Sequence, residues 1–323
     1  MKVCIVGGAG FIGSHFTDRL LADAGTERVT LYDNFSSGRE WHFAHHLADA
    51  RLTVVRGEVA DLPALTNAMH GHDLVIHLAS NPDIARAMTD PRVDFDEGTA
   101  LTFHVAEAAR LAGVGEILYA SGSGVYGDLG ELEVEEDHGP LLPTSTYGAS
   151  KLAGEALLSS YAAMFGISAS VFRFGNVVGP RQTHGVGFDF IRRLRRKPEV
   201  LEILGDGCQS KSYIHVDDVV EAVLAMRASR QKPFEAFNVA TGDYITVTEI
   251  ALLALQVLDL TEDTTELRYS GGDRGWKGDV PIVRLSTDRV RARGWSCTRT
   301  SEEALLASMR ALIDDDQLGR LTS

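Results

Sequence analysis

The stretch Lys2-Val-Cys-Ile-Val-Gly-Gly-Ala-Gly-Phe-Ile-Gly13 decides the fold of this chain. Its apolar start predicts a strand, and three spaced glycines follow directly. Gly7 permits a tight turn, Gly10 lets backbone N–H groups approach a pyrophosphate, and Gly13 lets the next helix pack close to the sheet. Asp33 ends a second apolar run 20 residues past Gly13, where a carboxylate accepts hydrogen bonds from an adenosine ribose. The pattern predicts a dinucleotide-binding unit that takes NAD, because Asp33 would repel the 2′-phosphate of NADP.

The composition argues against several classes of protein. At 323 residues the chain can bury a substantial core, and its 44% hydrophobic content is that of a globular protein. A formal net charge of −14 argues against a nucleic acid or an anionic membrane as partner, since both attract basic surfaces. The cysteines match no metal or redox motif, no apolar run reaches membrane-spanning length, and the first predicted strand begins at residue 2. We therefore expect a cytoplasmic protein without a signal peptide.

Short apolar runs alternate with helical patterns in the first half of the chain. The runs predict strands over 2–6, 29–32, 52–55, 74–77, 116–120 and 168–174. Amphipathic patterns predict helices over 11–23, 99–111, 147–165, 217–228, 247–258 and 301–313. This alternation predicts an α/β fold, a doubly wound parallel (Rossmann) sheet, with a smaller mixed α/β substrate-binding lobe. We expect an NAD-binding domain over 1–175, to which 213–240 returns, a mainly substrate-binding lobe over 176–323, and a substrate cleft between them.

A second motif, Tyr147-Gly-Ala-Ser-Lys151, carries the candidate chemistry. On a helix, Tyr147 and Lys151 lie one turn apart and point the same way. A lysine ammonium favours the ionised form of a neighbouring phenol. Tyr147 is therefore a candidate general base, which would take a hydroxyl proton while a hydride leaves the same carbon.

The chain resembles the extended short-chain dehydrogenase/reductase family, specifically its nucleotide-sugar epimerase and dehydratase branch. The resemblance runs nearly end to end, and it implies NAD-dependent chemistry on a nucleotide sugar, most simply a UDP-sugar. It also implies a homodimer that pairs the helices predicted at 99–111 and 147–165. Beyond the two motifs above, it depends on His77-Leu-Ala-Ser80, Ser121-Gly-Ser-Gly-Val-Tyr-Gly127, Arg173-Phe-Gly-Asn176, Gly179-Pro-Arg-Gln182, Gly205-Asp-Gly207, Tyr213-Ile-His-Val-Asp-Asp218 and Gly278-Asp-Val-Pro281.

The resemblance implies which residues bind the cofactor. Glu58-Val59 matches the pair that contacts the adenine, although the family more often has aspartate first. Residues 78–80 would line the pyrophosphate and the nicotinamide ribose, which Lys151 would also hold. The full implied set is Gly7, Gly10, Phe11, Ile12, Gly13, Asp33, Asn34, Ser36, Ser37, Gly38, Glu58, Val59, Leu78, Ala79, Ser80, Tyr147 and Lys151.

The implied substrate site departs from the family at three positions. The usual hydroxyl residue is Gly122 here, so Ser123, or failing that Ser121, would orient the sugar hydroxyl beside the catalytic pair. Lys211 replaces a usual arginine and keeps only a point charge. Phe95 replaces a usual asparagine near the cofactor. The implied substrate contacts are Ser123, Tyr147, Asn176, Val186, Glu202, Leu204, Lys211, Tyr213 and Arg274.

The same resemblance helps to choose the reaction. Dehydratases of the family carry an Asp-Glu pair just before Val-Tyr-Gly, and related decarboxylases commonly keep the glutamate. This chain has Ser123-Gly124 there, so the sequence offers no acid or base beyond Tyr147. We expect inversion at C4 of a UDP-hexose or UDP-hexuronate through a transient 4-keto intermediate. The alternatives are an NDP-sugar dehydratase or decarboxylase, and a non-catalytic NAD-binding regulator.

The identity of the sugar depends on a basic segment, Arg192-Arg-Leu-Arg-Arg-Lys197, which follows a predicted substrate loop over 185–188. The segment is either a solvated helix face or, with Arg181, a contact for a diphosphate or a uronic carboxylate. UDP-glucose/UDP-galactose and UDP-glucuronate/UDP-galacturonate therefore both stay open.

We expect no metal site. His42, His45 and His46 lie close together, and His42 and His46 would share a helix face. No acidic or cysteine ligand accompanies them in the sequence, and the expected chemistry needs no metal. A separate acidic run over 131–137 predicts a solvated loop before the catalytic helix.

Overall fold

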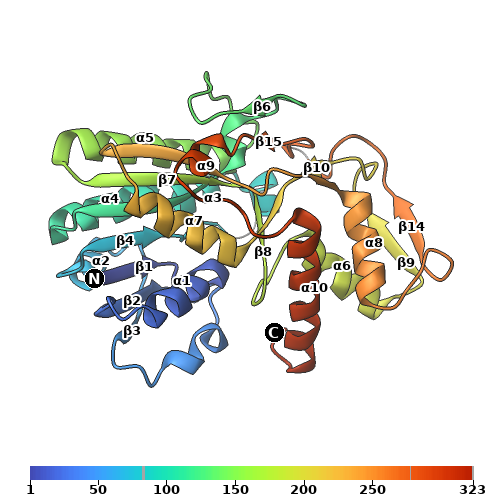
Figure 1. The fold of residues 1–323 in the computed structure, drawn as a ribbon, viewed down its shortest axis with the longest axis horizontal. Helices are drawn as coiled ribbons and strands as arrows, with labels where there is room; N and C mark the ends of the chain where they lie inside the picture. The colour runs from blue at the N-terminus through green and yellow to red at the C-terminus, as the bar shows by residue number, and fades with distance from the viewer. Residues whose placement is uncertain (82–83, 277, 322–323) are drawn as a thin grey trace. The chain divides into compact units, whose positions relative to one another are not determined.

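The computed structural model describes residues 1–81, 84–276 and 278–321. Seven strands form a central sheet in the order β12-β7-β5-β4-β1-β2-β3 (Figure 1). The pairs β1·β2, β1·β4, β2·β3 and β4·β5 are parallel. This order, which starts in the middle of the sheet, confirms the predicted doubly wound fold. The strands are β1 (Lys2–Val6), β2 (Arg28–Asp33), β3 (Leu52–Arg56), β4 (Leu74–His77), β5 (Glu116–Gly122), β7 (Ser168–Phe174) and β12 (Phe234–Val239).

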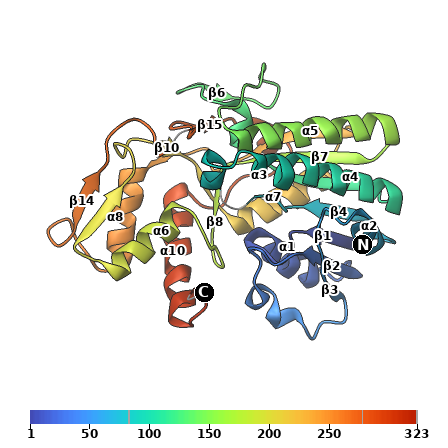
Figure 2. The same ribbon diagram turned by 180° about the vertical axis from the view of Figure 1, so that it is seen from behind.

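Helices cover both faces of the sheet, with α4 and α5 on one face and α1 and α7 on the other (Figures 1 and 2). On the side of α2, α4 and α5 the core includes Cys4, Val75, Val105, Ile117 and Leu158, each at most 1% exposed. Burial on both faces explains why the strands read as continuous apolar runs. The helices are α1 (Phe11–Ala22), α2 (Leu62–Met69), α3 (Arg92–Asp94), α4 (Leu101–Ala112), α5 (Thr146–Phe165) and α7 (Val216–Ala228).

The helix α5 is confirmed at its predicted position, because local residues define both ends. The Ser145 side chain accepts a hydrogen bond from the backbone N–H of Gly148 at 3.1 Å, and such a cap contributes about 1 kcal/mol. Gly166 ends the helix with φ +71°. The helix predicted over 99–111 begins differently, since a π-helix, η4 (Phe95–Ala100), precedes α4. A π-helical turn holds one more residue than an α-helical turn. The side chains before it therefore point in directions that an uninterrupted α-helix would not give them.

The chain divides into two compact units. The first, with most of the sheet, comprises 1–126, 140–173 and 220–237, and the second comprises 127–139, 174–219 and the chain from 238 onward. Residues 127–139, which the sequence suggested for the first domain, thus belong to the second unit. None of the described helices is long and apolar enough to cross a bilayer.

The described part of the second unit is built from two-stranded sheets and helices. Its core includes Phe190, Leu194, Ile250 and Leu305. The strand pairs are β6 (Glu133–Val134) with β15 (Arg284–Leu285), β8 (Asn176–Val178) with β11 (Tyr213–His215), β9 (Val200–Ile203) with β14 (Glu266–Tyr269), and β10 (Ser210–Lys211) with β13 (Ile245–Thr246). The helices are α6 (Val186–Arg196), α8 (Val247–Val257), α9 (Asp288–Ala292) and α10 (Ser301–Gln317).

Two loops expected from the sequence in this unit need correction, the first in full and the second in part. The predicted substrate loop over 185–188 is the first turn of α6, which begins at Val186 after Gly185. The acidic run over 131–137 is mostly exposed as expected, but it contains the short strand β6, and Glu136 within it is only 6% exposed. The Glu136 carboxylate accepts a hydrogen bond from the backbone N–H of Asn238 at 2.8 Å and lies 3.4 Å from Arg289. A partner distant in sequence therefore holds this acid inside the unit.

Candidate active site

The glycine-rich turn after β1 leaves no room for side chains. Gly7 has φ +83°, and a Cβ there would lie 2.7 Å from the backbone nitrogen of Ala79. A Cβ on Gly13 would lie 2.7 Å from the Gly7 carbonyl oxygen. Gly10 is the N-cap residue of α1, and because it has no side chain it makes no capping hydrogen bond. The first N–H groups of α1 are therefore left to a ligand, and a phosphate suits them.

Asp33 connects this turn to the loop that follows β2. Its carboxylate accepts hydrogen bonds from the backbone N–H groups of Ala9 at 2.9 Å and Phe35 at 2.8 Å. Burial raises the pKa of Asp33, and these two hydrogen bonds and Arg56 oppose that shift. Because a carboxylate has about four lone-pair positions, two backbone hydrogen bonds still leave acceptors for a ribose.

Four other residues expected at the cofactor follow the carboxyl ends of β2, β3 and β4. The Asn34 side-chain amide donates to the Glu58 carboxylate at 3.0 Å, which joins the segments after β2 and β3. The backbone N–H groups of Leu78 and Ala79 donate to the Val6 carbonyl at 2.9 and 3.0 Å, which joins the ends of β4 and β1. Parallel sheets bind their ligands at this edge.

The predicted catalytic pair is present on α5. The Lys151 Nζ lies 5.5 Å from the centroid of the Tyr147 ring and donates to the Ala120 carbonyl at 2.9 Å. Lys151 is 3% exposed, whereas Tyr147 is half-buried. Burial opposes the ammonium most strongly, but the neighbouring Tyr147 and Tyr119 outweigh it, so the pKa of Lys151 is raised. Lys151 therefore stays positively charged beside the phenol of Tyr147, which is partly accessible.

The two candidate serines occupy different environments. The Ser121 hydroxyl is buried and donates to the Glu155 carboxylate at 2.6 Å. Glu155 also pairs with Arg173 at 2.6 Å, and Arg173 donates to the Tyr126 hydroxyl at 2.9 Å. Ser123 begins the 3₁₀ turn η5 (Ser123–Tyr126) and is half-buried. Of the two serines, Ser123 is therefore the one with a hydroxyl not committed to this network.

Asp94 is a residue of this region that the sequence analysis missed. It is 1% exposed, and its carboxylate accepts hydrogen bonds from Asn81 at 2.9 Å and from Thr146 at 2.6 Å. Thr146 begins α5 directly before Tyr147, so Asp94 fixes the start of the catalytic helix. Phe95, which stands where the family has asparagine, is 59% exposed. Phe95 is the first residue of the π-helix η4, which left no clear signal in the sequence.

In the second unit, Lys211 and Arg274 both contact Asp279, through its side chain and its backbone carbonyl, respectively. The Lys211 Nζ lies 2.7 Å from the Asp279 carboxylate, and Arg274 donates to the Asp279 carbonyl at 2.9 Å. Arg274 also pairs with Asp128 at 2.6 Å. Asp279 and Asp128 were not singled out from the sequence, although Asp279 belongs to the motif 278–281. Both cations are therefore held in place before any ligand arrives.

The remaining substrate candidates differ in exposure. Asn176 is exposed, and its backbone N–H donates to the Ser212 carbonyl at 3.0 Å. Glu202 and Leu204, at the end of β9, are exposed, and Val186 is half-buried at the start of α6. The Tyr213 side chain is only 7% exposed and packs in the core of this unit, which leaves little of it for a ligand.

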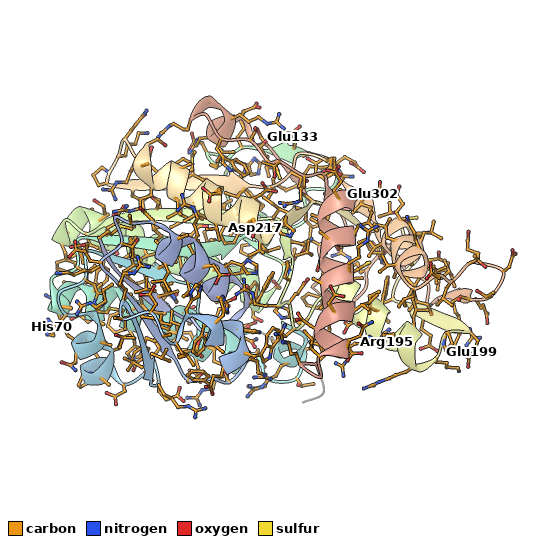
Figure 3. All side chains as sticks on the ribbon, turned by 60° about the horizontal axis from the view of Figure 1, so that its bottom comes forward. His70, Glu133, Arg195, Glu199, Asp217 and Glu302 are labelled. Carbon is orange, nitrogen blue, oxygen red and sulfur yellow. The ribbon has the colours of Figure 1, made fainter. Side chains whose placement is uncertain are left out.

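The basic segment at the end of α6 is a solvated face. Arg195, labelled in Figure 3, is exposed and pairs with Asp316 at 2.6 Å. Arg193 donates to the Glu202 carbonyl at 3.2 Å, and the Arg192 guanidinium stacks 5.1 Å from the centroid of the Phe188 ring. These contacts favour the first of the two interpretations made from the sequence.

Comparison with known proteins decides the family. The sequence model of the NAD dependent epimerase/dehydratase family matches residues 3–240. The chain belongs to this family.

Relatives in the epimerase/dehydratase family include 4-epimerases and a 4,6-dehydratase. UDP-glucose 4-epimerase of Mycolicibacterium smegmatis is 35% identical over 249 residues, which cover 75% of this chain and 78% of the relative. The crystal structure of a UDP-galactose 4-epimerase is 37% identical, covers 98% of this chain and 99% of its own, and has a TM-score of 0.86. DesIV, a dTDP-glucose 4,6-dehydratase from Streptomyces venezuelae solved as a double mutant with NAD, is 25% identical, covers 98% of both chains and has a TM-score of 0.90.

Membership of this family makes NAD the cofactor, and the residues present fit it. The turn at Gly7 and Gly13 excludes side chains, the first turn of α1 lacks a side-chain cap, and Asp33 offers acceptors at the end of β2. These are the requirements of a pyrophosphate and a ribose. The individual contacts expected from the sequence stay predictions.

Proposed function

We propose that this chain is an NAD-dependent UDP-hexose 4-epimerase that interconverts UDP-glucose and UDP-galactose. The observation that carries the proposal is the Tyr147–Lys151 pair, because the described carboxylates that act on this region are already held by other side chains. Two buried carboxylates of the same unit, Asp94 and Glu155, act electrostatically on Lys151 and on Tyr119. Both already accept strong hydrogen bonds from Thr146 and Arg173, respectively. A dehydratase needs an additional acid and base, whereas 4-epimerisation needs one base.

The residues of the first unit divide the work of this reaction. Tyr147 takes the proton from the sugar 4-hydroxyl, and the Lys151 ammonium stabilises the resulting phenolate. Bound NAD supplies the acceptor for the hydride at C4 and its source on return. Ser123 orients the 4-hydroxyl by hydrogen bonding. After the 4-keto sugar turns over, Tyr147 returns its proton to the 4-oxygen, and the product has the opposite configuration at C4.

A neutral hexose suits the site better than a uronic acid. A uronate needs a cation committed to its carboxylate. Within the basic segment, Arg192, Arg193 and Arg195 are exposed and already contact protein groups. We therefore assign UDP-glucose and UDP-galactose as substrates, with Lys211 and Arg274 near the nucleotide and Asn176 at the diphosphate.

The test is product analysis with the purified full chain and catalytic NAD. UDP-galactose, UDP-glucose and UDP-glucuronate are incubated separately, and products are separated by anion exchange and weighed by mass spectrometry. We expect a new peak of unchanged mass from the two neutral sugars. A product lighter by water or carbon dioxide would identify a dehydratase or decarboxylase, and faster turnover of UDP-glucuronate would reassign the sugar. Tight NAD binding without turnover of any nucleotide sugar would instead support a regulator.

We also propose that two copies associate through α4 and α5. Both helices carry large apolar side chains at the surface of the first unit: Phe103 is 43% exposed, Leu111 48%, Met164 71% and Phe165 46%. Patches of this kind commonly mark sites of association. The proposed setting is the cytoplasm, where the free thiols of the three cysteines would stay reduced.

A further inference from the structure

Two histidines and one aspartate that take no part in the proposed reaction meet in the first unit. The Asp18 Oδ1 lies 2.9 Å from the His45 Nε2 and 2.7 Å from the His46 Nε2. The two imidazole rings are 4.1 Å apart at their centroids. All three potential ligand atoms lie within 4.8 Å of one another. Two ring nitrogens therefore lie close to the same carboxylate oxygen.

This arrangement overturns one premise of the sequence analysis. The histidines were expected to have no acidic partner, but Asp18 comes from α1, whereas His45 and His46 form the 3₁₀ turn η2 (Ala44–His46). The expected pairing of His42 with His46 is also wrong. His42 lies in a separate turn, η1 (Glu40–His42), is fully buried, and has its Nδ1 2.8 Å from the Ala9 carbonyl oxygen.

We propose that Asp18, His45 and His46 form a binding site for a divalent transition-metal ion of the Zn²⁺ class. Imidazole nitrogen and carboxylate oxygen are ligands that Zn²⁺ takes at about 2.0–2.2 Å. Three such ligands around one ion leave a fourth position for water. The exposure of His45, 52%, leaves that position open to solvent, whereas His46 at 22% and Asp18 at 33% are partly shielded. The nitrogen-rich set disfavours Mg²⁺ and Ca²⁺, which prefer all-oxygen ligands.

The site would join two segments that both adjoin the glycine-rich turn. Asp18 lies on α1, which starts at that turn. The segment before η2 already contacts the turn, because the Arg39 N–H donates to the Ala9 carbonyl at 3.1 Å and His42 lies against the same oxygen. A bound ion would therefore tie η2 to α1 and stabilise the fold of this region, independently of any turnover.

Zinc binding by the chelator-stripped full chain tests the proposal. Isothermal titration with ZnCl₂ is expected to show about one equivalent bound with a Kd in the micromolar range, and the thermal midpoint should rise with Zn²⁺. Asp18→Asn and His46→Gln should each weaken Zn²⁺ binding at least about tenfold. The control is His70→Gln, an exposed histidine after α2 that is labelled in Figure 3, and it should bind as the unchanged chain does.

Co²⁺ supplies a readout that does not depend on stability. Its visible absorption on the unchanged chain should show the intense bands of a four-coordinate ion, and His45→Gln should remove them. The proposal is overturned if the unchanged chain binds no Zn²⁺ in the micromolar range, which would leave the cluster a set of hydrogen bonds. It is equally overturned if the Asp18 and histidine variants, shown to be folded by circular dichroism, bind Zn²⁺ as tightly as the control.

Discussion

At the scale of single residues, burial sorts the polar groups around Tyr147 into those that support the site and those that can react. Lys151 and Asp94 are almost fully buried and each makes fixed hydrogen bonds. Tyr147 and Ser123 keep part of their surface exposed. A proton carrier must reach the substrate, so this contrast supports the roles proposed for these two partly exposed residues.

The first prediction concerns the proposed base. Tyr147→Phe removes only the hydroxyl and should lower kcat for UDP-galactose by about a hundredfold to ten-thousandfold, the usual contribution of a general base. The Tyr161→Phe variant is a matched control on the same helix, because its hydroxyl donates to Glu107 at 3.0 Å instead. Its kcat should stay within about twofold. Equal losses in both variants would show that α5 was disturbed and that Tyr147 has no special role.

The second prediction concerns the buried ion pair beside Ser121. Glu155 and Arg173 are each 5% exposed, and Glu155→Gln would leave the guanidinium buried without its counter-charge. Breaking a buried pair in this way costs about 3–5 kcal/mol, and we expect a loss of this size in the free energy of unfolding measured with urea. The exposed pair Arg92–Asp96 provides the control, since Asp96→Asn should change that free energy by at most about 0.5 kcal/mol. A small change in Glu155→Gln would mean that water reaches Arg173.

At the scale of elements, the junction of β1 and α1 depends on the absence of side chains more than on any contact. The backbone of the turn packs against the start of α1, and a Cβ on Gly13 would also lie 2.7 Å from the Gly8 Cα. Backbone atoms cannot move aside as the end of a flexible side chain can. The position of α1 relative to the turn is therefore set by glycine, and with it the direction of its first N–H groups.

The third prediction follows from this junction. Gly13→Ala should weaken NAD binding by at least about tenfold, or about 1.4 kcal/mol, measured by calorimetry, because α1 must shift away from the turn. Alanine is the better helix former by up to about 1 kcal/mol, so helix propensity cannot account for a loss. Gly115→Ala is the control, since a Cβ there meets nothing within 4 Å. Unchanged NAD affinity in Gly13→Ala would show that the turn tolerates the shift.

At the scale of the whole molecule, surface composition bears on assembly. The formal net charge of −14 keeps like molecules apart, so association needs a local apolar surface. The α4–α5 surface offers four large apolar side chains, described above, and an Arg110 guanidinium 5.3 Å from the Phe165 ring centroid. This surface belongs to the first unit alone and does not involve the residues proposed to bind the nucleotide sugar in the second.

The fourth prediction tests this surface. Sedimentation velocity of the full chain should give twice the mass of one chain, and Met164→Glu should shift it to a single chain, because a charge in an apolar interface is costly. Leu47→Glu is the control, since Leu47 is 54% exposed but lies outside α4 and α5. A monomeric unchanged chain, or a dimer that survives Met164→Glu, would contradict the proposed interface.

Much of the fold and the catalytic pair could be predicted because their signals are local. The strand β4 forms over the residues expected, the turn at Gly7 has the positive φ that its sequence predicts, and Tyr147 and Lys151 share α5 because helical spacing requires it. Each of these features depends on residues within a few positions of one another. Backbone sterics and side-chain periodicity act at that range, so the sequence alone determines them.

Only the tertiary structure decided which distant residues meet. Asp18 joins His45 and His46, Glu155 joins Arg173 with Ser121, and Asp94 joins Asn81 with Thr146, across separations that no local pattern reports. For the same reason, the expected solvation of Glu136 was wrong. The sequence alone also could not decide between Ser121 and Ser123. Whether a polar side chain is buried depends on the partner that satisfies it, and packing of the whole chain supplies that partner.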